Sequence, residues 1–147
     1  MRREIVIGGV SSITLGLTVD SEQSLIGDAQ PRFIVEALPY KDGSLDFSKT
    51  DGSLHYDDRT LTYVFNVKAG SPAELESKRS QVVTWIMAGA GGDLIDNYRP
   101  GYKFTSIRPK VNSVTIVSRN HTICKIQAVI AAAPYMVSMT DPTERRL

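Results

Sequence analysis

Residues 59–67 read Arg59-Thr60-Leu61-Thr62-Tyr63-Val64-Phe65-Asn66-Val67. Apolar side chains occupy the odd positions from 61 to 67, whereas Val64 is the only apolar residue at the even positions. Successive side chains of a strand point to opposite faces, so this alternation predicts a strand with one buried face. Antiparallel sheets commonly have one such face, and the segment therefore favours a mainly β, antiparallel fold.

Shorter stretches of similar character occur before and after this segment. We expect further strands at residues 5–8, 15–19, 33–38, 102–107, 111–119 and 122–133. The last two are predicted to form a hairpin that turns at Asn120-His121, because asparagine tolerates a positive φ. Pro134 would end the second of them.

One helix is marked at its start by Ser71-Pro72-Ala73-Glu74. A serine N-cap, a proline at the first helical position and a glutamate at the third form a capping box. Apolar residues then recur at spacings of three and four as far as Ile86, and the glycines from Gly89 onward are expected to supply a left-handed C-cap. The pattern predicts one helix over about 72–88, packed on the sheet.

A long polar connection, residues 39–58, follows the expected strand at 33–38. It contains Asp42-Gly43-Ser44-Leu45 and Asp51-Gly52-Ser53-Leu54, which we interpret as two separate turns with the same Asp-Gly chemistry. Loops of this length are uncommon in compact domains unless they bind something or are disordered. The connection is therefore predicted to be an assembly or interface loop, with candidate residues Tyr40, Lys41, Asp42, Asp46, Asp51, Asp57, Asp58 and Arg59.

The composition fits one globular domain. A chain of 147 residues with 41% apolar and 22% charged residues can bury a core without disulfides. Its 17 Lys+Arg and 16 Asp+Glu give a net charge of +1, which argues against broad nucleic-acid binding, and one cysteine cannot make an intrachain disulfide. We expect a single domain over 1–137 and a polar C-terminal tail over 138–147 that frays or docks on a neighbour.

The first residues are not expected to be a signal peptide. Glu4 lies in the charged region, hydroxyl residues interrupt the apolar run, and no small-residue cleavage site follows. No window is apolar enough to cross a bilayer, so we predict no membrane insertion.

The sequence offers no catalytic set. His121 and Cys124 are three residues apart, but such residues point to opposite faces of a strand, which favours a buried, inert thiol. Asp46, Ser48, Thr50 and Asp51 resemble alternating calcium ligands, yet glycine falls at the seventh position rather than the sixth and no glutamate closes the loop. We therefore predict no enzymatic activity, no metal and no cofactor.

Four ordered parts of the sequence point to a known family. They are Gly9-Val10-Ser11-Ser12 with Leu15-Gly16-Leu17 and Val19; Pro39-Tyr40-Lys41-Asp42-Gly43-Ser44-Leu45-Asp46 with Tyr56-Asp57-Asp58-Arg59-Thr60-Leu61-Thr62-Tyr63-Val64-Phe65; Asp96-Asn97-Tyr98-Arg99-Pro100-Gly101-Tyr102-Lys103-Phe104; and Ala133-Pro134-Tyr135. Together they resemble the distal tail proteins of long-tailed, non-contractile bacteriophages and related prophages. The second part is similar to that family's P-x-x-D-G-x-L-D block and Y-x-x-R-x-L-x-x-x-F strand, and the third to its D-x-x-x-P-G-Y-x-F segment.

The resemblance implies an antiparallel β-barrel or sandwich of the phage tail-tube type with one packed helix. It also implies a virion structural protein, a homohexameric ring that joins the tail tube to the tail tip or baseplate while DNA passes through the lumen. The implied partners are the tail tube protein and the tail-tip hub or baseplate proteins. The implied location is the virion tail tip, after synthesis in the host cytoplasm without secretion.

Three departures from the family pattern affect these expectations. Tyr40 and Lys41 replace a Gly-Arg pair that often follows the proline, and Lys49 and Thr50 are more polar than in many members. The chain also ends soon after Tyr135, where many members continue into a galectin-like domain. The resemblance therefore implies a short form of the family, consisting of the N-terminal ring domain.

Two alternatives remain open from the sequence. A tail tube subunit or tube terminator would share the same fold and would differ in how its rings stack. A small binding module, non-catalytic or an enzyme, would instead use Asp46, His55, Asp57 and Asp58 as a site.

Overall fold

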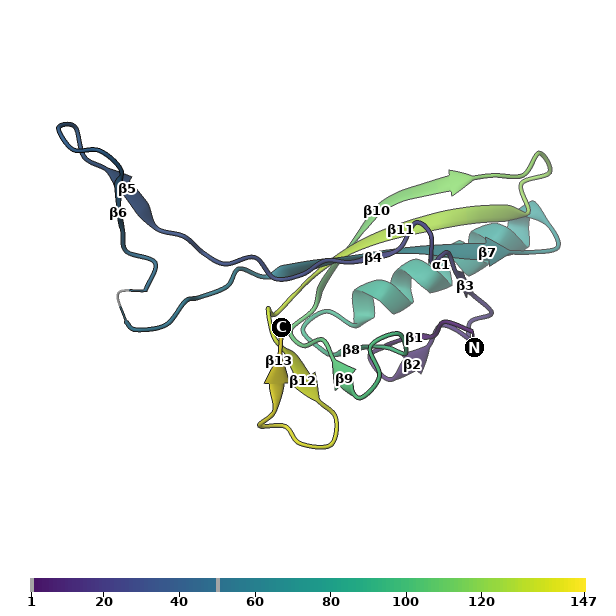
Figure 1. Cartoon of the computed structure of the whole chain (residues 1–147). Coiled ribbons are helices and arrows are strands. Elements are labelled where there is room, and N and C mark those ends of the chain that lie inside the picture. Colours follow the sequence, from purple (N-terminus) through teal and green to yellow (C-terminus); the bar gives the residue numbers. More distant parts are fainter. Residues whose placement is uncertain (1, 50) are drawn as a thin grey trace.

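The computed structural model describes residues 2–49 and 51–147 (Figure 1). Over these residues it is mainly β, with antiparallel sheets and a single helix, as the sequence predicts. The elements in chain order are β1 (Ile5–Ile7), β2 (Val10–Ser11), β3 (Thr18–Val19), β4 (Leu25–Ile26), β5 (Val35–Ala37), β6 (Ser44–Asp46), β7 (Arg59–Lys68), α1 (Pro72–Ala88), β8 (Leu94–Asp96), β9 (Tyr102–Lys103), β10 (Arg108–Ile116), β11 (Ile123–Ala132), β12 (Met136–Ser138) and β13 (Arg145–Arg146).

The main sheet has the order β10-β11-β7-β3, and β4 also pairs with β7. In the β7–β11 ladder Phe65 lies opposite Ile126 and Tyr63 opposite Ala128, so apolar residues of both strands share one face. The alternation expected along β7 is confirmed, because the side chains at 61, 63, 65 and 67 are all buried. This face carries the core.

Helix α1 covers that face and has the predicted bounds. Ser71 Oγ accepts the N–H of Glu74 at 3.2 Å, and the Glu74 carboxylate accepts the N–H of Gly70 at 3.1 Å, one residue earlier than in a strict capping box. Trp85 packs edge-on against Phe65, with ring centroids 5.5 Å apart. These contacts join the helix to the centre of the main sheet.

The left-handed glycine expected just past the helix is Gly91, and not the C-cap residue Gly89. Gly89 has a φ of −79° in the right-handed region, and the left-handed conformation occurs at Gly91, with a φ of +80°. Glycine is needed at position 89 for space, because a Cβ there would lie 2.1 Å from the Ile7 side chain. The glycine thus lets β1 approach the end of α1.

A smaller sheet, β2-β1-β8, packs beside the helix and contributes to the same core. A buried polar cluster surrounds Asp96, the last residue of β8. Arg3 binds the carboxylate of Asp96 at 2.7 Å, and the Tyr63 hydroxyl donates to the same carboxylate at 2.9 Å. Burial, reinforced by the charge of Asp96, raises the pKa of Tyr63 above its ordinary range. The cluster links the N-terminal segment, β7 and β8.

The β10–β11 turn and the C-terminal segment differ from the sequence expectations. In the β10–β11 hairpin the positive φ belongs to His121, at 56°, rather than to Asn120. Ser118 Oγ accepts the N–H groups of Thr122 and Ile123 and so closes the turn after His121. At the C-terminus, within the predicted tail 138–147, β13 pairs with β12, which also pairs with β9. The end of this chain thus forms a hairpin on its own body.

The largest difference lies between β4 and β7. The strand expected at 33–38 exists as β5, but it pairs only with β6, inside the predicted loop 39–58. Figure 1 shows these residues extending well away from the rest of the molecule. We call residues 28–49 and 51–58 the arm and the remaining described residues the body.

The arm begins where the chain leaves β4. The N–H of Gly27 donates to the Thr60 carbonyl at 2.9 Å, and a Cβ at Gly27 would lie 2.4 Å from that oxygen. Only glycine therefore lets the outgoing chain lie this close to β7.

Within the described residues, no helix is long and apolar enough to span a membrane.

Candidate functional site

The arm is a two-stranded ribbon with a tip, residues 38–43, and a side lobe, residues 46–49 and 51–55. Val35 pairs with Asp46 and Ala37 with Ser44, and the N–H of Phe47 donates to the Ile34 carbonyl at 2.7 Å. Nearer the body, a bridge between Pro31 and Tyr56 continues the ribbon. The arm is thus held by its own backbone pairing along most of its length.

Asp-Gly chemistry shapes the tip and the lobe, as the sequence indicates. Gly43 has a φ of +79° at the tip, a conformation that favours glycine. In the lobe, Asp46 accepts the N–H of Ser48 at 2.9 Å, and the Ser48 hydroxyl accepts the N–H of Ile34 at 2.7 Å. The bond from the Ser48 side chain lowers the pKa of Asp46, and contact with His55 lowers that of Asp51.

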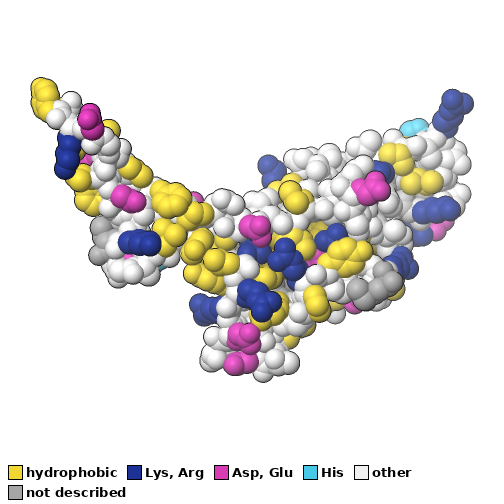
Figure 2. Space-filling model, in the orientation of Figure 1, with side chains coloured by type: hydrophobic (Ala, Val, Ile, Leu, Met, Phe, Trp, Pro, Cys, Tyr) yellow, Lys and Arg dark blue, Asp and Glu magenta, His cyan; other side chains and the backbone are white. Residues whose placement is uncertain are grey.

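Apolar side chains on the arm are exposed, although they would suit a core. Phe33 is 63% exposed, and Tyr40 at the tip is fully exposed. Figure 2 shows hydrophobic side chains along the arm and at its junction with the body. The apolar arm residues are Phe33, Ile34, Val35, Leu38, Tyr40, Leu45 and Phe47. Isolated hairpins are marginal in water and exposed apolar patches mark interaction sites, so the arm has the character of a binding element.

The predicted site residues fall into three groups on the arm and its root. Tyr40, Lys41 and Asp42 are exposed at the tip, and Asp46 and Asp51 hold the turns of the lobe. At the root, Asp57 forms an ion pair with Arg32 at 2.8 Å, and Asp58 forms one with Arg108. The tip residues are therefore the most available to another molecule.

Arg59 differs from the rest of this set because it opens β7 and is 1% exposed. Its guanidinium donates to the Pro134 carbonyl at 3.1 and 3.3 Å and lies 5.4 Å from the centre of the Phe104 ring. Burial, followed by the charge of Arg99, lowers the pKa of Arg59. In this chain Arg59 joins the root of the arm to the segment after β11.

Sequence reasoning missed the apolar arm residues other than Tyr40 as interface candidates. The sequence predicts only a strand at 33–38 and assigns it no interface. A signal was present, because Phe33, Ile34 and Val35 are consecutive and make both faces of the strand apolar. Neither face finds a core in this chain.

Two further features of the sequence, the thiol of Cys124 and the calcium-like pattern at 46–51, can be located in the structure. Cys124 is fully buried, as expected, and burial raises the pKa of its thiol. Among residues 2–49 and 51–147, no three His, Cys, Asp or Glu side chains cluster in a way that could hold a metal ion. Thr50, one residue of the calcium-like pattern, lies outside the described residues.

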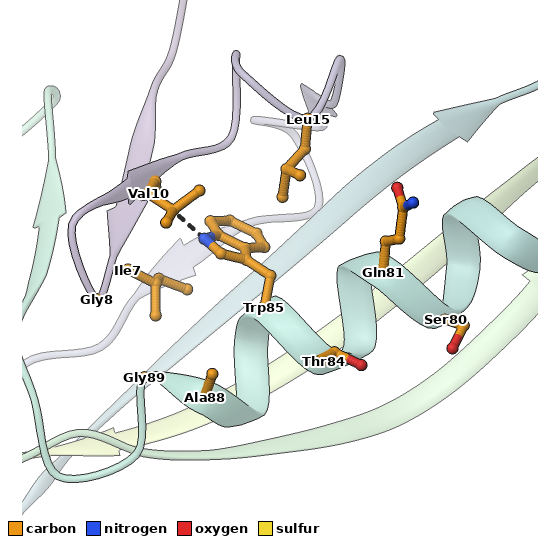
Figure 3. Close-up of a pocket in the computed structure, with 10 residues that line it drawn as sticks. All are labelled: Ile7, Gly8, Val10, Leu15, Ser80, Gln81, Thr84, Trp85, Ala88 and Gly89. Carbon is orange, nitrogen blue, oxygen red and sulfur yellow. Dashed lines mark hydrogen bonds between the residues drawn. The ribbon is translucent and has the colours of Figure 1, made fainter.

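A second surface feature lies on the body, between α1 and the start of the chain. We call it the Trp85 groove (Figure 3). It has a volume of about 400 Å³ and is lined by Ile7, Gly8, Val10, Leu15, Ser80, Gln81, Thr84, Trp85, Ala88 and Gly89. The indole N–H of Trp85 donates to the Val10 carbonyl at 2.9 Å, which satisfies its polar atom and leaves an apolar ring beside the groove.

Comparison with known proteins gives a clear likeness among solved structures. The chain matches no protein-family model and no curated protein. Among solved structures it is similar to the crystal structure of SPP1 Dit (gp 19.1), described as a paradigm of the hub adsorption apparatus in phages that infect Gram-positive bacteria. The TM-score is 0.66 at 10% sequence identity, and the match covers 94% of this chain and 53% of the SPP1 protein. This chain thus has the fold of that phage protein and spans about half of its length.

Proposed function

We propose that this chain is a structural protein of a phage tail, and more specifically a distal tail protein whose homohexameric ring joins the tail tube to the tail tip or baseplate. The observation that carries the proposal is the fold shared with SPP1 Dit over 94% of the chain. The ordered family-like segments of the sequence support the same assignment. The protein would then be located in the virion tail, with the tube and hub proteins as its neighbours.

The exposed arm supports assembly into a ring. A ring is built from heterologous contacts, in which one patch of a subunit meets a different patch of the next. The arm provides one such patch, because it carries exposed apolar residues away from the body. Its length lets one subunit reach another without changing the fold of the body.

Light scattering after size exclusion, over a concentration series, tests the proposal directly. We expect a species with six times the 16.2 kDa mass of the chain, and rings with a central opening in negative-stain images. Stacks that grow without limit would move the assignment to the tail tube. A monomer at every concentration would contradict self-assembly and favour a small binding module.

An arm-less variant provides the matched control. Residues 32–55 would be replaced by Asn-Gly, which closes a two-residue turn beyond the Pro31–Tyr56 bridge. We expect a folded monomer, because the arm contributes little to the core. Recovery of an intact ring from this variant would refute the role of the arm.

A further inference from the structure

We propose that the Trp85 groove binds the arm of a neighbouring copy of this chain. The proposal rests on the ring assembly proposed above and names the surface that receives the arm. Its starting point is that the chain carries two apolar features, the arm and the groove, that do not meet each other within one molecule.

The groove is built for an apolar segment. None of its lining residues is charged, and its floor is formed by the side chains of Ile7, Leu15 and Trp85. Its volume, about 400 Å³, is near the lower end of the range for pockets that hold a drug-sized ligand, which is room for a few side chains.

The arm has the matching chemistry. Ile34, Leu45 and Phe47 share one face of the ribbon, since Ile34 is bonded to Phe47, and Leu45 and Phe47 are two residues apart. Glu36, which pairs with Leu45, lies on the same face and brings one charge among these apolar side chains. The ribbon has only two strands, so its outer edges carry backbone N–H and C=O groups without ladder partners. Hydroxyl and amide side chains on the groove wall, at Ser80, Gln81 and Thr84, can bind such groups.

The occupant must come from another copy because the arm of the same chain extends away from the body. Each subunit then donates one arm and receives one arm. Contacts of this kind between two different patches propagate from copy to copy and end only when the ring closes. The pairing therefore agrees with the assembly that the fold suggests.

Two separated variants test the pairing. The groove variant, Thr84→Arg, places a long charged side chain in the groove from an exposed position on α1 and keeps the arm intact. Ser77→Arg is its matched control, because it adds the same charge to an exposed position of α1 outside the groove. Gln81→Arg is a second groove variant, in case the first fails to fold, and urea unfolding checks all three.

We expect Ser77→Arg to assemble as the unmodified chain does, and the groove variants to associate about tenfold or more weakly, which is the loss of one central contact. The arm-less variant keeps its groove, and mixing it with Thr84→Arg should give one-to-one pairs that do not grow further. Trp85 is the only tryptophan, so its fluorescence should shift on mixing only when the groove is occupied.

The outcomes separate this inference from the proposed function. Rings from folded Thr84→Arg, at the concentrations that suffice for the unmodified chain, would overturn the groove as receptor and leave the tail-ring proposal standing. Mixed variants that stay monomeric would overturn the pairing in the same way. An unmodified chain that is monomeric at every concentration would overturn both proposals.

Discussion

Two pairs of antiparallel strands in this molecule make opposite use of apolar residues. The β7–β11 pair is formed by two strands of ten residues and lies against α1, and Phe65 at its centre is fully buried. The β5–β6 pair is formed by two strands of three residues, and Phe33 beside it is 63% exposed. Hydrophobic side chains thus stabilise the fold in the body and remain available for association on the arm.

Phenylalanine truncation should separate the two regions most strongly. Phe65→Ala removes a fully buried ring that packs against Trp85 and should lower the free energy of unfolding by about 3–5 kcal/mol. Phe33→Ala removes the same group from the arm and should change it by less than about 0.5 kcal/mol. Urea unfolding of both variants measures the difference, and similar losses would show that the arm belongs to the core.

Alkaline pH should destabilise the body through Tyr63. The folded chain keeps this phenol protonated because its pKa is raised, whereas the unfolded chain releases the proton near the ordinary value of 10.0. The contribution is therefore fully present below pH 10 and is lost above it, by about 1.4 kcal/mol per pH unit.

Above pH 10, the free energy of unfolding of Tyr63→Phe should fall less steeply with pH than that of the unmodified chain. The difference in slope should be about 1.4 kcal/mol per pH unit. Tyr40→Phe, at the exposed tip, should leave it unchanged, because that phenol lies in water in both states. Unfolding curves at a series of alkaline pH values decide the matter, and parallel slopes for Tyr63→Phe and the unmodified chain would contradict the prediction.

Loss of the helix cap should have a smaller effect. Ser71→Ala removes the acceptor for the Glu74 N–H and should cost about 1 kcal/mol. Ser53→Ala, on the arm lobe, removes an exposed hydroxyl that has no such role and should be close to neutral. The two midpoints of thermal unfolding provide the test, and equal shifts would argue against a capping contribution.

The smallest effect on global stability is expected from a strained tip. Gly43→Ala forces alanine into a left-handed conformation and should cost the arm about 1 kcal/mol. Because the arm can open by itself, the global free energy of unfolding should change by less than about 0.5 kcal/mol, while the Phe47 amide exchanges hydrogen faster. For this variant, hydrogen exchange should report a loss of stability in the arm that urea unfolding does not detect. An equal loss in the global free energy of unfolding would show that the arm unfolds together with the body.

The long elements of the body could be predicted from the sequence because their signals are local. The bounds of α1 follow from Ser71, Pro72 and the glycines after it, and β7 follows from its alternation. Strands such as β8 and β12 have only three residues, too few for a periodic pattern. Their existence depends on which distant strand lies beside them, which a single sequence does not display.

Part of the arm, residues 39–58, could be predicted as a long connection with turns, but the exposure of its apolar side chains could not. Its turns were readable because Asp-Gly chemistry acts within a few residues, as Gly43 shows. The exposure of Phe33 could not be read, because hydropathy reports that a side chain avoids water and not which surface covers it. Arg59 was likewise grouped with the loop, since the Pro134 carbonyl that binds it is distant in sequence.

The close approach of Gly27 to Thr60 has an evolutionary consequence. Selection for a new binding partner can rewrite the arm freely, since its side chains are not needed for the core. It cannot as easily rewrite Gly27, because any larger residue would collide with the Thr60 carbonyl and redirect everything beyond it. Among related chains we expect variable arm sequences to diverge from a constant point of departure.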